Sequence, residues 1–117
     1  MREVIILKVR YKIWMENEEG KVFGDGPFDI LTRVERTGSL RQAALEINMS
    51  YSQAWNLIRG LEERLGFSLL KRKVGGEKGG GSYLTDEAMD LREKYKIFHR
   101  QAAKNIDLIY QQTFKGK

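Results

Sequence analysis

The sequence predicts an α+β, mainly helical fold, because three patterns follow one another along its 117 residues. Residues 4–23 alternate and turn back as a pair of strands would. Residues 27–65 carry apolar side chains at helical spacing, interrupted twice by short breaks. Residues 67–113 begin with two extended stretches around a glycine-rich segment and end in one long helical pattern. We expect these elements to form a single domain over residues 1–117.

The N-terminal residues 4–14 alternate between two faces, which predicts a strand with one buried and one exposed side. A turn follows at residues 16–20, and residues 21–23 can return as a short partner strand. The basic face is interpreted as the solvated side of the strand, rather than as part of a binding surface. The buried side would hold Ile5, Leu7, Val9, Tyr11 and Ile13, and the exposed side Lys8, Arg10 and Lys12.

Residues 27–37 predict the first helix. Pro27 suits the first helical position, with Asp25 or Gly26 as the N-cap. Gly38 would end the helix, since glycine adopts the left-handed conformation found after helix C-termini. The inner face of this helix would consist of Phe28, Leu31 and Val34.

Residues 39–65 predict two amphipathic helices joined by a tight turn. The first has apolar residues at positions i, i+3, i+4 and i+7, and Asn48-Met49-Ser50 breaks that period. Ser50 is a suitable N-cap for the second helix. This arrangement is typical of a helix-turn-helix, whose second helix enters the major groove of DNA. The two stripes are Leu40, Ala43, Ala44 and Ile47, then Ala54, Leu57, Ile58, Leu61 and Leu65.

The glycine-rich segment at residues 75–81 lies between two extended stretches, so residues 67–84 predict a hairpin of the type called a wing. Thr85 would cap a last helix over residues 86–113. One small domain could cover only the first turns of that helix. We therefore expect a homodimer, formed through the apolar line of Leu91, Tyr95, Phe98, Ala102 and Ile109.

Composition favours a nucleic-acid partner and excludes several other functions. The net charge is +5, and no cysteine and only one histidine are present, which leaves no thiolate or histidine metal site. No segment has the length of a signal peptide or a membrane span, so we expect a cytoplasmic protein. The glycine-rich segment lacks the Gly-Lys-Ser/Thr ending of a P-loop. We expect neither an enzyme nor a cofactor.

The polar face of the predicted recognition helix offers side chains that can pair with base edges, and the wing offers cations for phosphates. Any exposed helix is polar and any hairpin can be solvated, so neither feature is decisive alone. Tyr51 and Trp55 could contact DNA or pack against the neighbouring helices, and Gly60 could mark a close approach to phosphate or to another element. The predicted base contacts are Ser52, Gln53, Asn56 and Arg59. The predicted phosphate contacts are Arg41, Ser50, Tyr51, Lys71, Arg72, Lys73 and Lys78.

Several motifs resemble the N-terminal winged-helix domain of ModE-type molybdate-responsive regulators, and more broadly the LysR-type DNA-binding domain. The specific signal is Ser-Tyr-x-x-Ala-Trp at residues 50–55, followed by glycines at 75–76 and 79–81 and by Leu84-Thr85. The LysR likeness rests on Ala43-Ala44 and on residues 61–66. The resemblance implies sequence-specific DNA binding, transcriptional regulation and dimerisation.

The resemblance does not extend to the oxyanion-binding domain of full-length family members, so we expect no oxyanion ligand in this chain. An alternative function is that of a non-catalytic adaptor whose winged helix binds protein rather than DNA.

Overall fold

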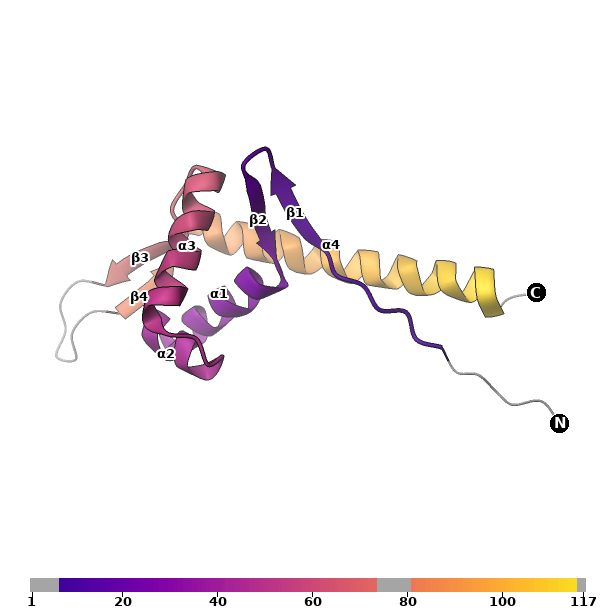
Figure 1. Ribbon diagram of the computed structural model, residues 1–117, viewed down its shortest axis with the longest axis horizontal. Helices are drawn as coiled ribbons and strands as arrows, with labels where there is room; N and C mark the ends of the chain where they lie inside the picture. The colour runs from indigo at the N-terminus through magenta and orange to yellow at the C-terminus, as the bar shows by residue number, and fades with distance from the viewer. Residues whose placement is uncertain (1–6, 74–80, 116–117) are drawn as a thin grey trace.

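The computed structural model describes residues 7–73 and 81–115 and confirms the predicted fold class. Figure 1 shows the shorter helices and the hairpins gathered at one end, with the last helix running away from them. The first hairpin contains β1 (Trp14–Asn17) and β2 (Gly20–Gly24), and the helices α1 (Asp25–Thr37), α2 (Leu40–Glu46) and α3 (Tyr51–Leu65) follow. The wing contains β3 (Leu70–Lys73) and β4 (Gly81–Leu84), and α4 (Asp86–Tyr110) continues into a π-helical turn at Gln111–Lys115.

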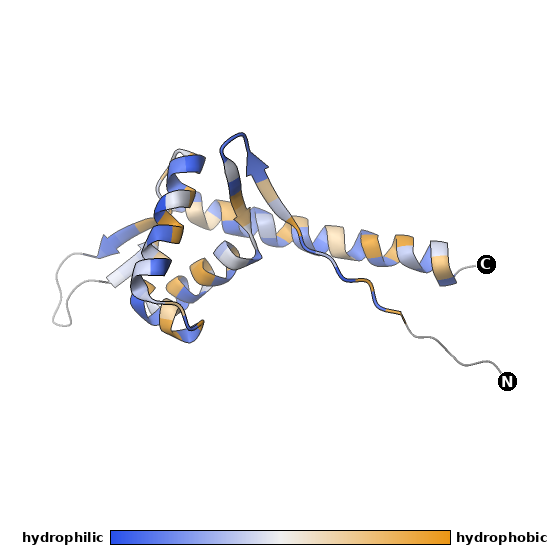
Figure 2. Cartoon of the chain, viewed as in Figure 1, coloured by the Kyte–Doolittle hydropathy of each residue, from blue (hydrophilic) through white to orange (hydrophobic). Residues whose placement is uncertain are grey.

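The core lies where α1, α2 and α3 meet, and it also receives side chains from both hairpins and from α4. Ala43 and Ala44 of α2 are fully buried, and their small size lets α3 cross α2 closely. Figure 2 shows a different pattern on α4, whose outer half carries hydrophobic residues beyond the reach of this core. The largest fully buried side chains are Phe23, Ile30, Leu31, Val34, Ile58, Leu61 and Leu69.

The predicted helix ends at Gly38, Ser50 and Thr85 are confirmed. Gly38 has a φ of 73° and its amide donates to the carbonyl of Val34. The hydroxyl of Thr85 accepts from the amide of Ala88 at 3.0 Å. Ser50 and Gln53 form a capping box, in which each side chain accepts from the other residue's backbone amide at 3.0 Å. Each of these ends depends only on residues close in the sequence.

The start of α1 differs from the prediction. The helix begins at Asp25, two residues before Pro27, and its N-cap is Gly24, which provides no side-chain hydrogen bond. Pro27 is thus the third helical residue, where its missing N–H costs nothing because the first turn of a helix has unpaired amides in any case. Its ring is buried.

The predicted strand over residues 4–14 is wrong for residues 7–13, and residues 4–6 lie outside the described residues. The first strand begins only at Trp14, and residues 7–13 are extended without a strand partner. They run beside α4 instead (Figure 1) and form with it a groove of about 360 Å³. Leu7, Val9 and Tyr11 line this groove but stay 39–53% exposed. An alternating pattern predicts only that an extended segment has one apolar and one polar face. Here the element beside the apolar face is a helix rather than a strand.

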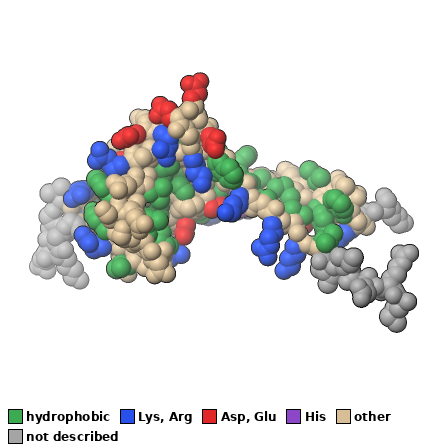
Figure 3. Space-filling view, viewed as in Figure 1, with side chains coloured by type: hydrophobic (Ala, Val, Ile, Leu, Met, Phe, Trp, Pro, Cys, Tyr) green, Lys and Arg blue, Asp and Glu red, His purple; other side chains and the backbone are tan. Residues whose placement is uncertain are grey.

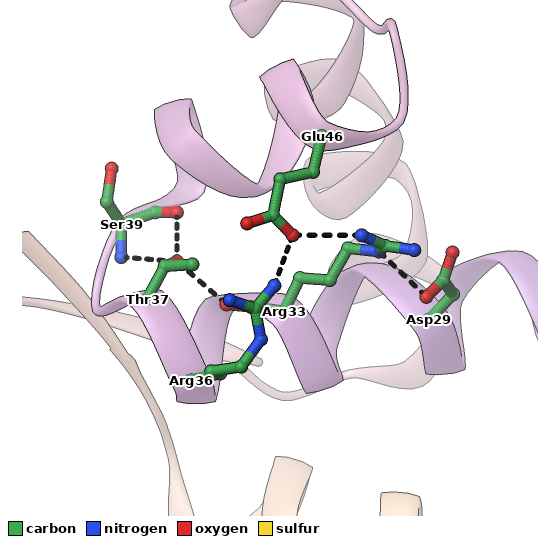
Figure 4. A network of polar contacts seen from close by, with 6 residues as sticks. All are labelled: Asp29, Arg33, Arg36, Thr37, Ser39 and Glu46. Atoms are coloured by element: carbon green, nitrogen blue, oxygen red, sulfur yellow. Dashed lines mark hydrogen bonds and ion pairs between the residues drawn. The ribbon is translucent and has the colours of Figure 1, made fainter.

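A polar network fastens α1 to α2 (Figure 4). The carboxylate of Glu46 accepts hydrogen bonds from Arg36 and, at 2.9 Å, from Arg33. Arg33 also donates to Asp29 one turn earlier in α1 at 2.9 Å. The hydrogen bond from Arg33 lowers the pKa of Glu46, and the same bond raises the pKa of Arg33. The network therefore holds the first helix of the helix-turn-helix in place at neutral pH.

Candidate nucleic-acid interface

Helix α3 buries one face and exposes the other. Ala54, Ile58 and Leu61 are at most 1% exposed, at spacings that place them on one side of the helix. All four predicted base-contacting residues are exposed, and none is used in the core: Ser52, Gln53, Asn56 and Arg59. The structure thus brings these four side chains to the surface of one helix.

The capping box limits what Gln53 can offer to a base. Its Oε1 atom accepts the amide of Ser50 at 3.0 Å, so only the side-chain NH₂ group is free to donate. Bidentate pairing with adenine needs both the oxygen and the nitrogen of the amide. Gln53 would therefore have to share its oxygen between the amide of Ser50 and adenine, whereas the side chain of Asn56 is exposed on the next turn.

Tyr51 and Trp55 lie one turn apart on the edge of α3, and each aromatic ring has at least one arginine guanidinium over it. Both rings are half-buried and pack against the core. The guanidinium of Arg41 lies over the Tyr51 ring, 4.4 Å from its centroid. Arg59 and Arg72 both lie over Trp55, each 5.5 Å from its centroid. The two rings therefore pack against the core, which was one of the two roles expected from the sequence. They also contact arginines of α2, α3 and the wing.

The contact between Trp55 and Arg72 of the wing was not predicted from the sequence. The spacing of Trp55 and Arg59 by four residues on a helix would have indicated their contact. Arg72 lies on another element, and nothing in the sequence places it on this ring.

Gly60, in turn, has the guanidinium of Arg64 as its nearest neighbour, 3.5 Å from where a Cβ would lie.

The two wing strands are antiparallel and in register from Leu70 opposite Leu84 to Lys73 opposite Gly81. Lys71, Arg72 and Lys73 are all exposed on β3, beside α3. Lys78 lies outside the described residues. The structure therefore presents three of the four predicted wing cations to solvent.

Several hydrogen bonds hold the base of the wing. The carboxylate of Glu62 accepts the amide of Leu69 at 2.7 Å, and the hydroxyl of Thr85 donates to the carbonyl of Ser68 at 2.7 Å. The amide of Ser82 donates to the carbonyl of Gly38 at 2.9 Å. These contacts tie β3 to α3 and β4 to the turn between α1 and α2, so the wing is fixed relative to the recognition helix.

Charge is unevenly spread over the face seen in Figure 3. Acidic side chains gather at the upper end, over the β1–β2 hairpin, where Glu16, Glu18 and Glu19 are exposed. Basic side chains lie along the lower and wing sides, and a few also lie just below the acidic ones. This separation suits a polyanion approaching α3 and the wing rather than the hairpin.

The predicted dimerisation residues do not share one environment. Phe98 and Ile109 are 52% and 59% exposed, and Leu91 and Ala102 are half-buried. Tyr95 is only 3% exposed and belongs to the core of its own chain. We therefore leave Tyr95 out of any surface for a second copy.

The hydroxyl of Tyr95 shows why this residue faces inward. It lies 2.5 Å from a carboxylate oxygen of Asp25 and 3.0 Å from the carbonyl oxygen of Ile13. Burial, and next the hydrogen bond to Asp25, raise the pKa of Tyr95, so the phenol stays protonated and can donate.

The exposed apolar surface of α4 is wider than the predicted line. Ile97 and Leu108 are 44% and 51% exposed, directly beside Phe98 and Ile109. The two adjacent pairs are separated by three helical turns. We call Ile97, Phe98, Leu108 and Ile109 the α4 patch.

Over residues 7–73 and 81–115, the structure offers no helix long and apolar enough to cross a membrane. Those residues also hold no cluster of three or more His, Asp or Glu side chains that could bind a metal ion.

The architecture and the exposed face of α3 define a winged helix-turn-helix DNA-binding domain of a transcriptional regulator, a class without catalytic activity. The family model described as "Bacterial regulatory helix-turn-helix protein, lysR family" matches residues 28–89. The chain belongs to this family.

Among curated proteins the chain is similar to ModE regulators. The transcriptional regulator ModE of Haemophilus influenzae is 34% identical over 71 residues, which cover 61% of this chain and 28% of that protein. The molybdenum transport protein ModE of Azotobacter vinelandii is 28% identical over 93 residues, or 80% of this chain and 34% of that protein. The DNA-binding transcriptional dual regulator ModE of Escherichia coli K12 is 29% identical over 90 residues, which cover 76% of this chain and 34% of that protein. The matches thus cover about a third of the length of these relatives.

Proposed function

We propose that this chain is a homodimeric, sequence-specific DNA-binding regulator of transcription that acts in the cytoplasm. In this proposal α3 enters the major groove, and the wing over residues 67–84 lies on the backbone or in the adjacent minor groove. The observation that carries the proposal is the position of Ser52, Asn56 and Arg59, exposed on α3 beside the cations of β3.

The base contacts are assigned to exposed residues of α3. Asn56 can pair with adenine and Arg59 with guanine, and Ser52 can bond to several base edges. Gln53 contributes as a donor while it stays in the capping box. The phosphate contacts are assigned to the predicted set Arg41, Ser50, Tyr51, Lys71, Arg72, Lys73 and Lys78, of which Lys78 lies outside the described residues.

The dimer is assigned to the α4 patch together with Leu91 and Ala102. Regulators of this class read two half-sites about one helical turn of DNA apart, roughly 34 Å, so two copies must be held at a set spacing. An outer helix with four exposed large apolar side chains is costly in water and suits a self-complementary contact. We treat residues 1–117 of each copy as one domain, because both hairpins and α4 contribute to one core.

The proposed function is limited to DNA. The relatives whose names mention molybdenum extend well beyond the matched region, so oxyanion binding is not assigned to this chain.

The test is selection of bound fragments from the genome of the source organism, followed by titration of the selected duplex and of random duplexes at several salt concentrations. A regulator of this kind should prefer the selected site by about a thousandfold or more at physiological salt. Its affinity should fall steeply as salt rises, because bound phosphates release counterions. Equal, weak binding to all duplexes would contradict the proposal and favour the protein-binding adaptor.

A further inference from the structure

We propose that Trp55 is a positioning residue for DNA binding, which holds Arg59 of α3 and Arg72 of the wing on one indole ring. The recognition helix and the wing then present their guanidinium groups as one unit. This inference rests on the proposed function, because it assigns a role within that DNA-binding surface.

The geometry joins two elements through a single side chain. The guanidinium carbons of Arg59 and Arg72 each lie 5.5 Å from the centroid of the Trp55 ring, within the range of cation–π attraction. Arg59 is one helical turn after Trp55, whereas Arg72 comes from the middle of β3. Trp55 is itself half-buried and packs against the core, so its ring is a fixed support.

A stacked arginine keeps its ability to bind an anion. The N–H groups of a guanidinium point outward in its plane, and its flat face is the part that rests on an aromatic ring. Arg59 and Arg72 are both exposed, so those donors face solvent. Stacking on Trp55 therefore restricts the rotamers of both side chains without using their hydrogen bonds.

The charges around Trp55 favour an anionic ligand. Across residues 7–73 and 81–115, neither Arg59 nor Arg72 forms an ion pair with a carboxylate, unlike Arg33, Arg36 and Arg92. Both guanidinium groups are cations within 5.5 Å of the same ring centroid, so they add to the positive potential around Trp55, which attracts the polyanionic DNA. The ligand of this site is thus DNA: Arg72 reaches a phosphate of the backbone while Arg59 reaches the guanine edge assigned to it, and the same ring positions both groups.

The first arm of the test uses the free protein. The side-chain NMR resonances of Arg59 and Arg72 should carry ring-current shifts in the wild type. These shifts should largely persist in Trp55→Phe and disappear in Trp55→Leu. Trp14→Leu is the matched control, because Trp14 also has a cation over its ring, Lys21 at 5.4 Å, but lies on β1. That variant should leave both arginine signals unchanged.

The second arm measures affinity for the selected duplex. Trp55→Leu should weaken binding by about three- to tenfold, and Trp55→Phe by no more than about twofold, in line with cation–π energies. In an Arg72→Ala background, Trp55→Leu should cost less, because one of the groups it positions is gone. Trp55→Phe keeps the test decisive if Trp55→Leu proves unstable.

The outcomes separate this inference from the proposed function. Unchanged arginine shifts in Trp55→Leu, or additive losses in the double variant, would overturn the role of Trp55 while DNA binding stands. A wild type with no affinity for any duplex would overturn the proposed function, and the arginine shifts would still show whether Trp55 holds both groups.

Discussion

The amide of Ser82 donates a hydrogen bond to the carbonyl of Gly38 at 2.9 Å, so the wing is attached to the turn that precedes the helix-turn-helix. Strand β4 and this turn thus meet although Ser82 and Gly38 are more than forty residues apart in the sequence. Together with the bonds of Glu62 and Thr85 at the other strand, this contact sets the angle between the wing and α3. The close approach has a steric requirement, which leads to the first prediction.

Gly81→Ala should destabilise the protein. A Cβ at Gly81 would lie 2.5 Å from the carbonyl oxygen of Gly38, so the backbone of β4 or of the turn must move. Overpacking of this kind costs about 1–3 kcal/mol, and urea unfolding would measure it. Gly26→Ala is the control: nothing lies within 4 Å of its Cβ position on α1. That change should be neutral or slightly stabilising. Equal stability of the two variants would show that the wing base adjusts freely.

The second prediction concerns acid stability through Glu46. The hydrogen bond from Arg33 lowers the pKa of Glu46 in the folded state below its unfolded value, which is about 4.3 for glutamate. The stabilisation of the fold by the Glu46 carboxylate is therefore complete above the unfolded pKa. It is lost as the pH falls through the lower, folded pKa.

Glu46→Gln should accordingly reduce the stability difference between about pH 7 and pH 3, because the variant no longer has this proton to bind. Urea unfolding at both pH values checks the result. Glu63→Gln, which replaces an exposed carboxylate of α3, serves as the control. Parallel pH curves for the wild type and Glu46→Gln would count against a role for this network in acid unfolding.

Helix ends were predictable because their chemistry is local. Ser50, Gly38 and Thr85 act on backbone groups within four residues, so the sequence pattern contains all the partners. The N-terminal strand was not predictable in the same way. Alternation along residues 7–13 is real, but the partner of the apolar side is α4, almost a hundred residues later.

The same distinction separates the parts of the candidate site. The exposed face of α3 follows from helical periodicity, and the structure has Ser52, Asn56 and Arg59 where the pattern puts them. Tyr95 lies on the same predicted line as Phe98, yet it belongs to the core of its own chain, and its hydroxyl contacts Ile13 and Asp25, which lie 82 and 70 residues away. Periodicity indicates that an apolar side chain is buried. Only the tertiary structure shows whether its own chain or a second copy buries it.

The third prediction concerns assembly. Phe98→Lys combined with Ile109→Lys should convert the dimer to monomers, since it places two charges in the α4 patch. Glu93→Lys is the control, because it changes the net charge equally at an exposed residue of α4 outside the α4 patch. Sedimentation at micromolar concentration measures the assembly. A monomeric wild type would contradict the proposed dimer, and dimers in the double variant would move the interface elsewhere.

The last prediction separates base reading from phosphate binding. Asn56→Ala should cost about 1–3 kcal/mol on the selected duplex and little on random DNA, because Asn56 is exposed on the face of α3 that we assign to the groove. Lys71→Ala should weaken both duplexes alike and reduce the slope of log affinity against log salt by about one, since a lysine on a phosphate releases one counterion.

Gln53→Ala tests the capping box in the same experiment. It should lower stability by about 0.5–1 kcal/mol in urea unfolding, because the amide of Ser50 loses its acceptor. Its loss of sequence preference should be smaller than that of Asn56→Ala, because the Gln53 oxygen already accepts the amide of Ser50. Titrations of both duplexes at several salt concentrations, with unfolding curves for each variant, provide the comparison. If Asn56→Ala and Lys71→Ala gave the same loss on both duplexes, the division of roles between α3 and the wing would be wrong.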